Sequence, residues 1–161
     1  MVKSHIEYGI IAYGGVEKHR LNRIKNLQKK AVRTVARDSR FSHSDPTFGN
    51  LELLKIDDLY SINVGVFMHK YLSSKLPISF SDMFKVFPEP NRTRNFVLEQ
   101  TKRKRLDSLP KVSMPKVWNN YDISLKTACN VNSFKSMFRT NKFLAYKSFQ
   151  CREINCYSCL N

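Results

Sequence analysis

The chain has 161 residues, enough for one domain or two small ones, and its hydrophobic share of 42% suffices for a packed core. Its 28 lysines and arginines against 13 aspartates and glutamates give a formal charge of +15, which favours nucleic acid as partner first and an anionic membrane surface second. The chain has no apolar run near the roughly 18 residues that span a bilayer and no signal-peptide pattern, so we expect an intracellular protein, nuclear or cytoplasmic, that is neither secreted nor membrane-bound.

The first predicted element is a dense apolar cluster between Ile6 and Tyr13. Its pattern fits a buried helix as well as a buried strand, and both interpretations stay open. Gly14 and Gly15 break the chain after it. Because a core element begins almost at the first residue, we expect the chain to be part of something longer.

The segment from Lys18 to Arg40 predicts an amphipathic helix around which the rest of the chain is organised. Its apolar residues recur every three or four positions and form a stripe that we expect to face the core. They are Leu21, Ile24, Leu27, Ala31, Val32 and Val35. At about 100° per residue the opposite side gathers basic residues, namely Arg23, Lys29, Lys30, Arg33 and Arg37, while Arg20 and Lys25 flank the stripe. Solvated helix faces usually mix both signs of charge, so we predict phosphate contacts by these five residues, with a merely solvated surface as the alternative.

Two more helices are predicted next. Asp45 followed by Pro46 is typical of a helix start, with the carboxylate as cap and the proline at the first helical position. The run from Ile56 to Leu72 is apolar on most sides, which predicts a central buried helix. Asp57 and Asp58 lie in its first turn, where the helix dipole stabilises them. We prefer this interpretation to a metal site because neighbouring residues on a helix do not face each other.

Residues 91 to 118 are polar and basic, and we expect extended chain there, or a short β-hairpin between Val97 and Trp118. The tetrad Lys102, Arg103, Lys104 and Arg105 is a candidate phosphate-binding or nuclear-import segment, with a solvated loop as the alternative. We expect Trp118 to anchor packing rather than to stack on a base.

A last helix is predicted from Val131 to about Phe149. Beyond it, Cys156 and Cys159 have metal-like spacing, with Cys151 nearby. A structural zinc site needs four ligands, and only the distant Cys129 is left to complete the set. We therefore expect no metal site in this chain, and free thiols.

Several segments, taken in order, resemble the C-terminal part of the reverse transcriptase of jockey-like non-LTR (LINE-type) retrotransposons. They are YGIIAYGG (Tyr8–Gly15), LNRIKNLQKKAVRTV (Leu21–Val35), HSDPTFGNLELLKIDDLY (His43–Tyr60), VFMHKYLSSKLP (Val66–Pro77), TRN (Thr93–Asn95), PKVWN (Pro115–Asn119) and SFKSMF (Ser133–Phe138). Each segment alone is weak, and the ordered series is the signal. Met114 stands where the family often has glycine, and the cysteine tail lies outside the pattern.

In such enzymes the aspartates that hold the catalytic magnesium ions lie in the palm, upstream of the resembling region, and this chain has no matching motif. The resemblance therefore implies a thumb-like and post-thumb segment of an RNA-directed DNA polymerase, without catalytic residues or a cofactor of its own. Magnesium is implied only for the palm, which is the expected protein partner. The expected nucleic-acid partner is an RNA–DNA hybrid or duplex DNA, gripped through its backbone.

Pattern and resemblance together predict a small, mainly α-helical bundle. Its thumb-like region covers residues 1–88, with the basic helix over 18–40, and its basic C-terminal region covers residues 89–161, with a helix over about 131–149 and the cysteine tail. Two alternatives remain open. One is a standalone basic nucleic-acid-binding or interaction protein domesticated from the element, and the other is an inert relic.

Overall fold

The structure is a computed structural model that describes residues 7–16, 18–87, 95–101 and 104–151, without the side chains of residues 18, 104 and 105. The regular elements within these residues are all helical, which confirms the predicted fold class. The α-helices are α2 (Ile10–Tyr13), α3 (Lys18–Ala36), α4 (Ser44–Asn50), α5 (Ile56–Leu72), α6 (Pro110–Asn119), α7 (Ile123–Lys126) and α8 (Val131–Lys147), and two short 3-10 helices are η1 (Ile78–Phe80) and η2 (Lys104–Ser108).

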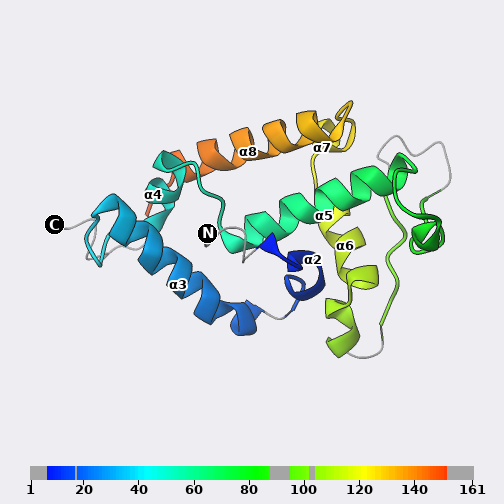
Figure 1. Cartoon of the computed structure of the whole chain (residues 1–161), viewed down its shortest axis with the longest axis horizontal. Coiled ribbons are helices and arrows are strands. Elements are labelled where there is room, and N and C mark those ends of the chain that lie inside the picture. Colours follow the sequence, from blue (N-terminus) through cyan, green and yellow to red (C-terminus); the bar gives the residue numbers. More distant parts are fainter. Residues whose placement is uncertain (1–6, 17, 88–94, 102–103, 152–161) are drawn as a thin grey trace.

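The α5 helix lies at the centre of the fold, with the bounds that the apolar run predicts (Figure 1). It contacts α2, α6 and α8, so it is covered on several sides, as a helix without a distinct polar face must be. One buried cluster joins α5 to both predicted regions of the chain. It includes Ile10, Phe48, Val64 and Met68 from the first region and Phe96, Met114, Trp118 and Phe134 from the second.

The α5 and α8 helices approach each other closely within this cluster. A Cβ atom added at Gly65 would lie 2.1 Å from Cζ of Phe134, so only glycine lets the ring come this near to the α5 backbone. The Phe134 ring also stacks on the ring of Trp118, with centroids 6.5 Å apart. Trp118 is fully buried, which confirms its predicted role as a packing anchor. The Asn130 side chain accepts a hydrogen bond from Ser133 N (2.8 Å) and thereby caps α8.

A chain of polar contacts reinforces this packing between α4, α5 and α8. Asp45 does not cap α4 as predicted, because its carboxylate pairs with Lys55 Nζ (2.6 Å). The Lys55 ammonium also lies 4.5 Å from the ring centroid of Tyr146, whose hydroxyl donates to Asp58. Asp58 in turn pairs with Lys142 Nζ (2.7 Å). The α4 helix begins at Ser44 with His43 at its N-cap position, two residues before the predicted start, so Asp45 lies in the first turn and its carboxylate makes a tertiary contact instead.

The hairpin predicted between Val97 and Trp118 is wrong, because α6 and η2 occupy the described part of that stretch. Pro110 occupies the start of α6, where a missing N–H has no consequence, and the buried Pro115 is accommodated inside the helix. An isolated antiparallel bridge joins Val86 to Phe96 instead. The Asn119 side-chain amide accepts a hydrogen bond from Phe96 N (2.9 Å) and donates one to the Phe96 carbonyl (2.8 Å). It thus satisfies both backbone groups, as a neighbouring strand would.

Lys126 is a buried lysine in this C-terminal half. Its Nζ donates to Asn95 Oδ1 (3.0 Å) and to the Asn119 carbonyl (2.8 Å), so it ties α7 to α6 and to the segment before η2. Burial lowers the pKa of the Lys126 ammonium, although the Asp122 carboxylate works in the opposite direction.

The α5–α8 contact generates a stability prediction. Gly65→Ala should lower the free energy of unfolding by about 1–3 kcal/mol through overpacking, even though alanine favours a helix interior over glycine by about 1 kcal/mol. Urea denaturation followed by circular dichroism measures the change. In the Phe134→Leu background the same substitution should be less destabilising, because the ring that it strikes is gone. A Gly65→Ala protein as stable as the parent would contradict the close approach.

Candidate nucleic-acid interface

The α3 helix begins where predicted but ends at Ala36 rather than at Arg40. Arg37 has a φ of 56°, in the left-handed region that often terminates a helix. Asp38 N still bonds to the Arg33 carbonyl (3.0 Å), which closes the last turn. The prediction of a continuous helix to Arg40 is thus wrong, and Arg37 and Arg40 lie in the segment that leads to α4.

A narrow line of residues holds α3 to the rest of the molecule. Leu21 and Val32 are buried on this line. Between them, Gln28 donates from Nε2 to the Leu54 carbonyl (2.9 Å) and accepts at Oε1 from Ile56 N (3.1 Å). Gln28 was not predicted as an anchor of α3, although a glutamine among the apolar residues of a helix stripe indicates a side chain that bonds across an interface.

Lys25 lies beside this line and pairs with Asp57 at the start of α5 (2.8 Å). Asp58 faces Lys142 and Tyr146 on α8 instead. The two neighbouring carboxylates thus point to different helices, in agreement with the argument against a shared metal ion.

The apolar stripe of α3 is only partly buried, which corrects the expectation that it faces the core. Leu21 and Val32 are covered, whereas Ile24, Leu27, Ala31 and Val35 are exposed. The reason is geometric, since α3 packs chiefly against α4 and lies at one edge of the molecule (Figure 1).

Most of the α3 residues that we predict to bind phosphate are exposed. Arg23, Lys29, Lys30 and Arg37 are exposed, and within the described residues none of them has an ion-pair partner. Arg33 is half-buried and donates from Nε to the Ser42 carbonyl (3.0 Å), so it also holds the segment after α3. The structure therefore brings four of the five to solvent and gives the fifth a structural contact.

Asp38, the residue after Arg37, is engaged by α4. Asp38 accepts a hydrogen bond from the Thr47 hydroxyl on α4. Arg20 and Arg40 add exposed charge, and the Arg40 guanidinium carbon lies 5.6 Å from the ring centroid of Phe41. The second predicted cluster is not placed as a site, because Lys102 and Arg103 lie outside the described residues. For Lys104 and Arg105 the structure describes only the backbone, which lies in η2.

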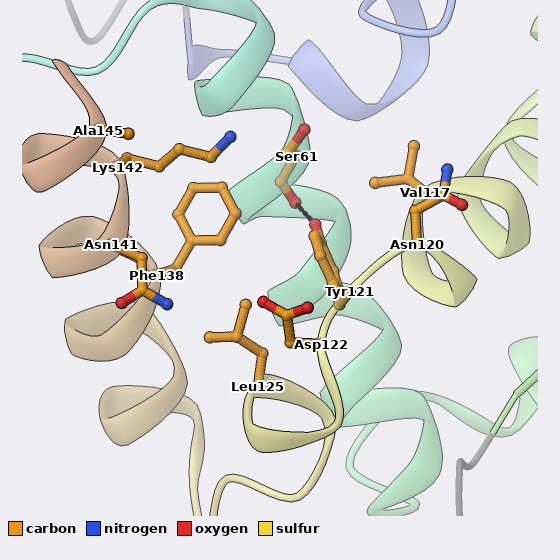
Figure 2. A pocket seen from close by; sticks show the side chains of 10 residues that line it. All are labelled: Ser61, Val117, Asn120, Tyr121, Asp122, Leu125, Phe138, Asn141, Lys142 and Ala145. Carbon is orange, nitrogen blue, oxygen red and sulfur yellow. Dashed lines mark hydrogen bonds between the residues drawn. The ribbon is translucent and has the colours of Figure 1, made fainter. Parts of the chain in front are cut away.

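A pocket of about 450 Å³ lies between α5, the end of α6, α7 and α8 (Figure 2). Three of its polar side chains are engaged within the protein. Tyr121 donates to the Ser61 carbonyl (2.5 Å), the Ser61 hydroxyl donates to the Asp57 carbonyl (2.9 Å), and the Lys142 ammonium pairs with Asp58. No nucleophile beside a base is found among the lining residues, so the basic surface of α3 is the stronger candidate site.

The described residues contain no group of three or more histidine, cysteine or acidic side chains that could hold a metal ion. Cys129 and Cys151 are free thiols, while Cys156 and Cys159 lie outside the described residues. None of the helices in the described ranges has the length and apolar character to cross a bilayer.

Comparisons of this chain with known protein families, with curated proteins and with solved structures find no match.

The anchoring of α3 generates a second prediction. Gln28→Met keeps the shape of the side chain but removes both hydrogen bonds, leaving the backbone groups of Leu54 and Ile56 unpaired at that point. The free energy of unfolding should fall by about 1–2 kcal/mol. Urea denaturation measures it, with Asn26→Met on the exposed side of α3 as the matched control. Equal stabilities of the two variants would show that the Gln28 contacts do not anchor the helix.

The buried tyrosine in the pocket generates a pH prediction. Burial, and secondarily the nearby Tyr60 and Asp58, raise the pKa of Tyr121 above its ordinary value. The folded protein therefore keeps this proton at a pH where an unfolded tyrosine loses it, so stability is full below about pH 10 and falls above it. Urea denaturation between about pH 8 and 11 should show this fall. It should be shallower in Tyr121→Phe, and an equally steep fall would contradict the assignment.

Proposed function

We propose that the exposed basic side of α3 binds the phosphate backbone of a nucleic acid, and that the chain is a thumb-like segment of a retrotransposon RNA-directed DNA polymerase. The observation that carries the binding proposal is the group of Arg23, Lys29, Lys30 and Arg37, which are exposed and without carboxylate partners in the described part of the chain. Cations left unpaired in a chain of charge +15 repel one another, and a polyanion relieves that repulsion.

The spacing of these cations suits a backbone rather than a base. Arg23 and Lys30 lie on the same side of α3, about 10 Å apart along its axis at 1.5 Å per residue. That distance covers about three nucleotides at 3.4 Å per phosphate on one strand. Long lysine and arginine stems on an exposed helix face can follow phosphates without entering a groove, so binding should not depend on sequence.

The polymerase part of the proposal is supported by the ordered resemblance of the segments between Tyr8 and Phe138. In that context α3 would grip the duplex that a palm has just synthesised. Sequencing the DNA upstream of the Met1 codon tests it. An in-frame palm with paired aspartates would support the proposal, whereas stop codons and frameshifts would favour the relic.

The binding proposal predicts a defined salt dependence. Each phosphate contact should contribute about −0.9 to the slope of log affinity against log salt on duplex DNA, so four contacts give a slope near −3.6. Arg23→Gln with Lys30→Gln should flatten the slope by about 1.8 and weaken binding to all sequences alike. Helix content should be kept, because glutamine is nearly as good a helix former as arginine and lysine. Fluorescence anisotropy of a labelled duplex and a labelled RNA–DNA hybrid across a salt series measures the slope.

A matched control removes the same charge from another helix. Lys135→Gln with Arg139→Gln changes two positive charges on α8 and should leave the slope unchanged. If both double variants flattened the slope equally, binding would follow net charge and the α3 surface would not be the site. If the Arg23/Lys30 variant lost affinity for one sequence only, these residues would be reading bases, and the backbone proposal would be wrong.

A further inference from the structure

The α3 helix carries an exposed apolar stripe beside its basic side. Leu27 and Val35 are 58% and 71% exposed, Ile24 is 38% exposed, and Ala31 between them is exposed as well. Large aliphatic side chains on a surface are ordinary when scattered, but three of them with an alanine in one continuous row on one helix face mark an interaction surface. We name these four residues the α3 stripe.

The α3 stripe has the geometry of a helix-pairing seam. In a heptad frame Ile24 and Ala31 occupy the a positions, Leu27 occupies a d position, and Val35 follows at e. The row runs from Ile24 to Val35, about 16 Å along the axis at 1.5 Å per residue, which is about three turns. A second helix of similar length can lay its own apolar side into such a row.

The charges beside the α3 stripe select the partner. One edge of the stripe adjoins the line of Leu21, Gln28 and Val32 that is occupied by the body of the molecule. The other edge carries Arg23 and Lys30, which fall at the g positions of the same heptad frame and have no ion-pair partner among the described residues. A partner with glutamate or aspartate at its flanking positions pairs with both, while a basic partner is repelled.

We propose that the α3 stripe is a docking site for an amphipathic helix of another protein, with leucine-type residues in its seam and acidic residues on its flank. A second copy of this chain is disfavoured as occupant. Antiparallel pairing would set g positions against g positions, so Arg23 and Lys30 would meet like charges, and each chain carries +15. The site shares Arg23 and Lys30 with the proposed nucleic-acid surface, so a nucleic acid competes with the partner helix for these two charges, while the aliphatic side chains supply affinity for the helix alone.

The experiment uses a fluorescein-labelled 21-residue peptide (about three heptads) with leucine at a and d and glutamate at e and g. A peptide of the same composition in scrambled order serves as the reference for pure charge attraction. Anisotropy should show the patterned peptide binding at least about tenfold more tightly than the scrambled one. Leu27→Gln with Val35→Gln should abolish that difference, while Leu144→Gln, at another exposed leucine on α8, should preserve it.

Circular dichroism must show that the Leu27/Val35 variant keeps its helix content, as expected for exposed positions. The inference is overturned if the two peptides bind equally, or if the patterned peptide binds the Leu27/Val35 variant as well as the parent. It is also overturned if sedimentation shows that the free chain dimerises through Leu27 and Val35. Binding to anionic vesicles that depends on these two residues, without peptide binding, would assign the stripe to a membrane surface instead.

Discussion

The arrangement of the molecule depends on how closely α5 and α8 approach each other at Gly65. Because this position lacks a side chain, the Phe134 ring reaches the α5 backbone and then meets Trp118, Tyr121 and Phe138 around it. The cluster draws its buried residues from helices that are far apart in the sequence, so the contact of two helices organises the others. The chain has a net charge of +15, and most of its charged side chains remain at the surface. A chain of this size therefore needs such a dense apolar centre.

The α3 helix lies outside this dense apolar centre. It is held by Leu21, Val32, the two Gln28 hydrogen bonds and one ion pair, rather than by deep burial along its length. A helix attached along so narrow a line exposes most of its circumference. One part of that circumference is basic and another is aliphatic, so a single element offers two chemically different surfaces.

The elements that were predicted correctly are the long helices, whose positions follow from local sequence patterns. The long apolar run gave α5 with its bounds, and the three-to-four spacing gave α3 and α8 nearly to their ends. Prediction failed at α6, because the polar and basic character of residues 91–118 was taken to indicate extended chain, whereas Pro110 at the helix start and Pro115 inside the helix are accommodated here. Periodicity also shows that a helix has an apolar side but not what covers it, so the exposure of Ile24, Leu27 and Val35 was not predictable. Arg33 was assigned to phosphate because it lies on the basic side of the helix, and its bond to the Ser42 carbonyl was not predictable because it depends on the loop after α3.

The burial of Lys126 has a consequence for chemical labelling. Its amine is enclosed by Asn95 and the end of α6, so an acylating reagent reaches it only when α7 separates from them. Once exposed, an amine reacts in its neutral form, and the surface lysines of α3 and α8 react without any such opening. The rate at which Lys126 is acylated therefore reports the frequency of local opening in the C-terminal half, and mass spectrometry can read it at a single residue in the native protein.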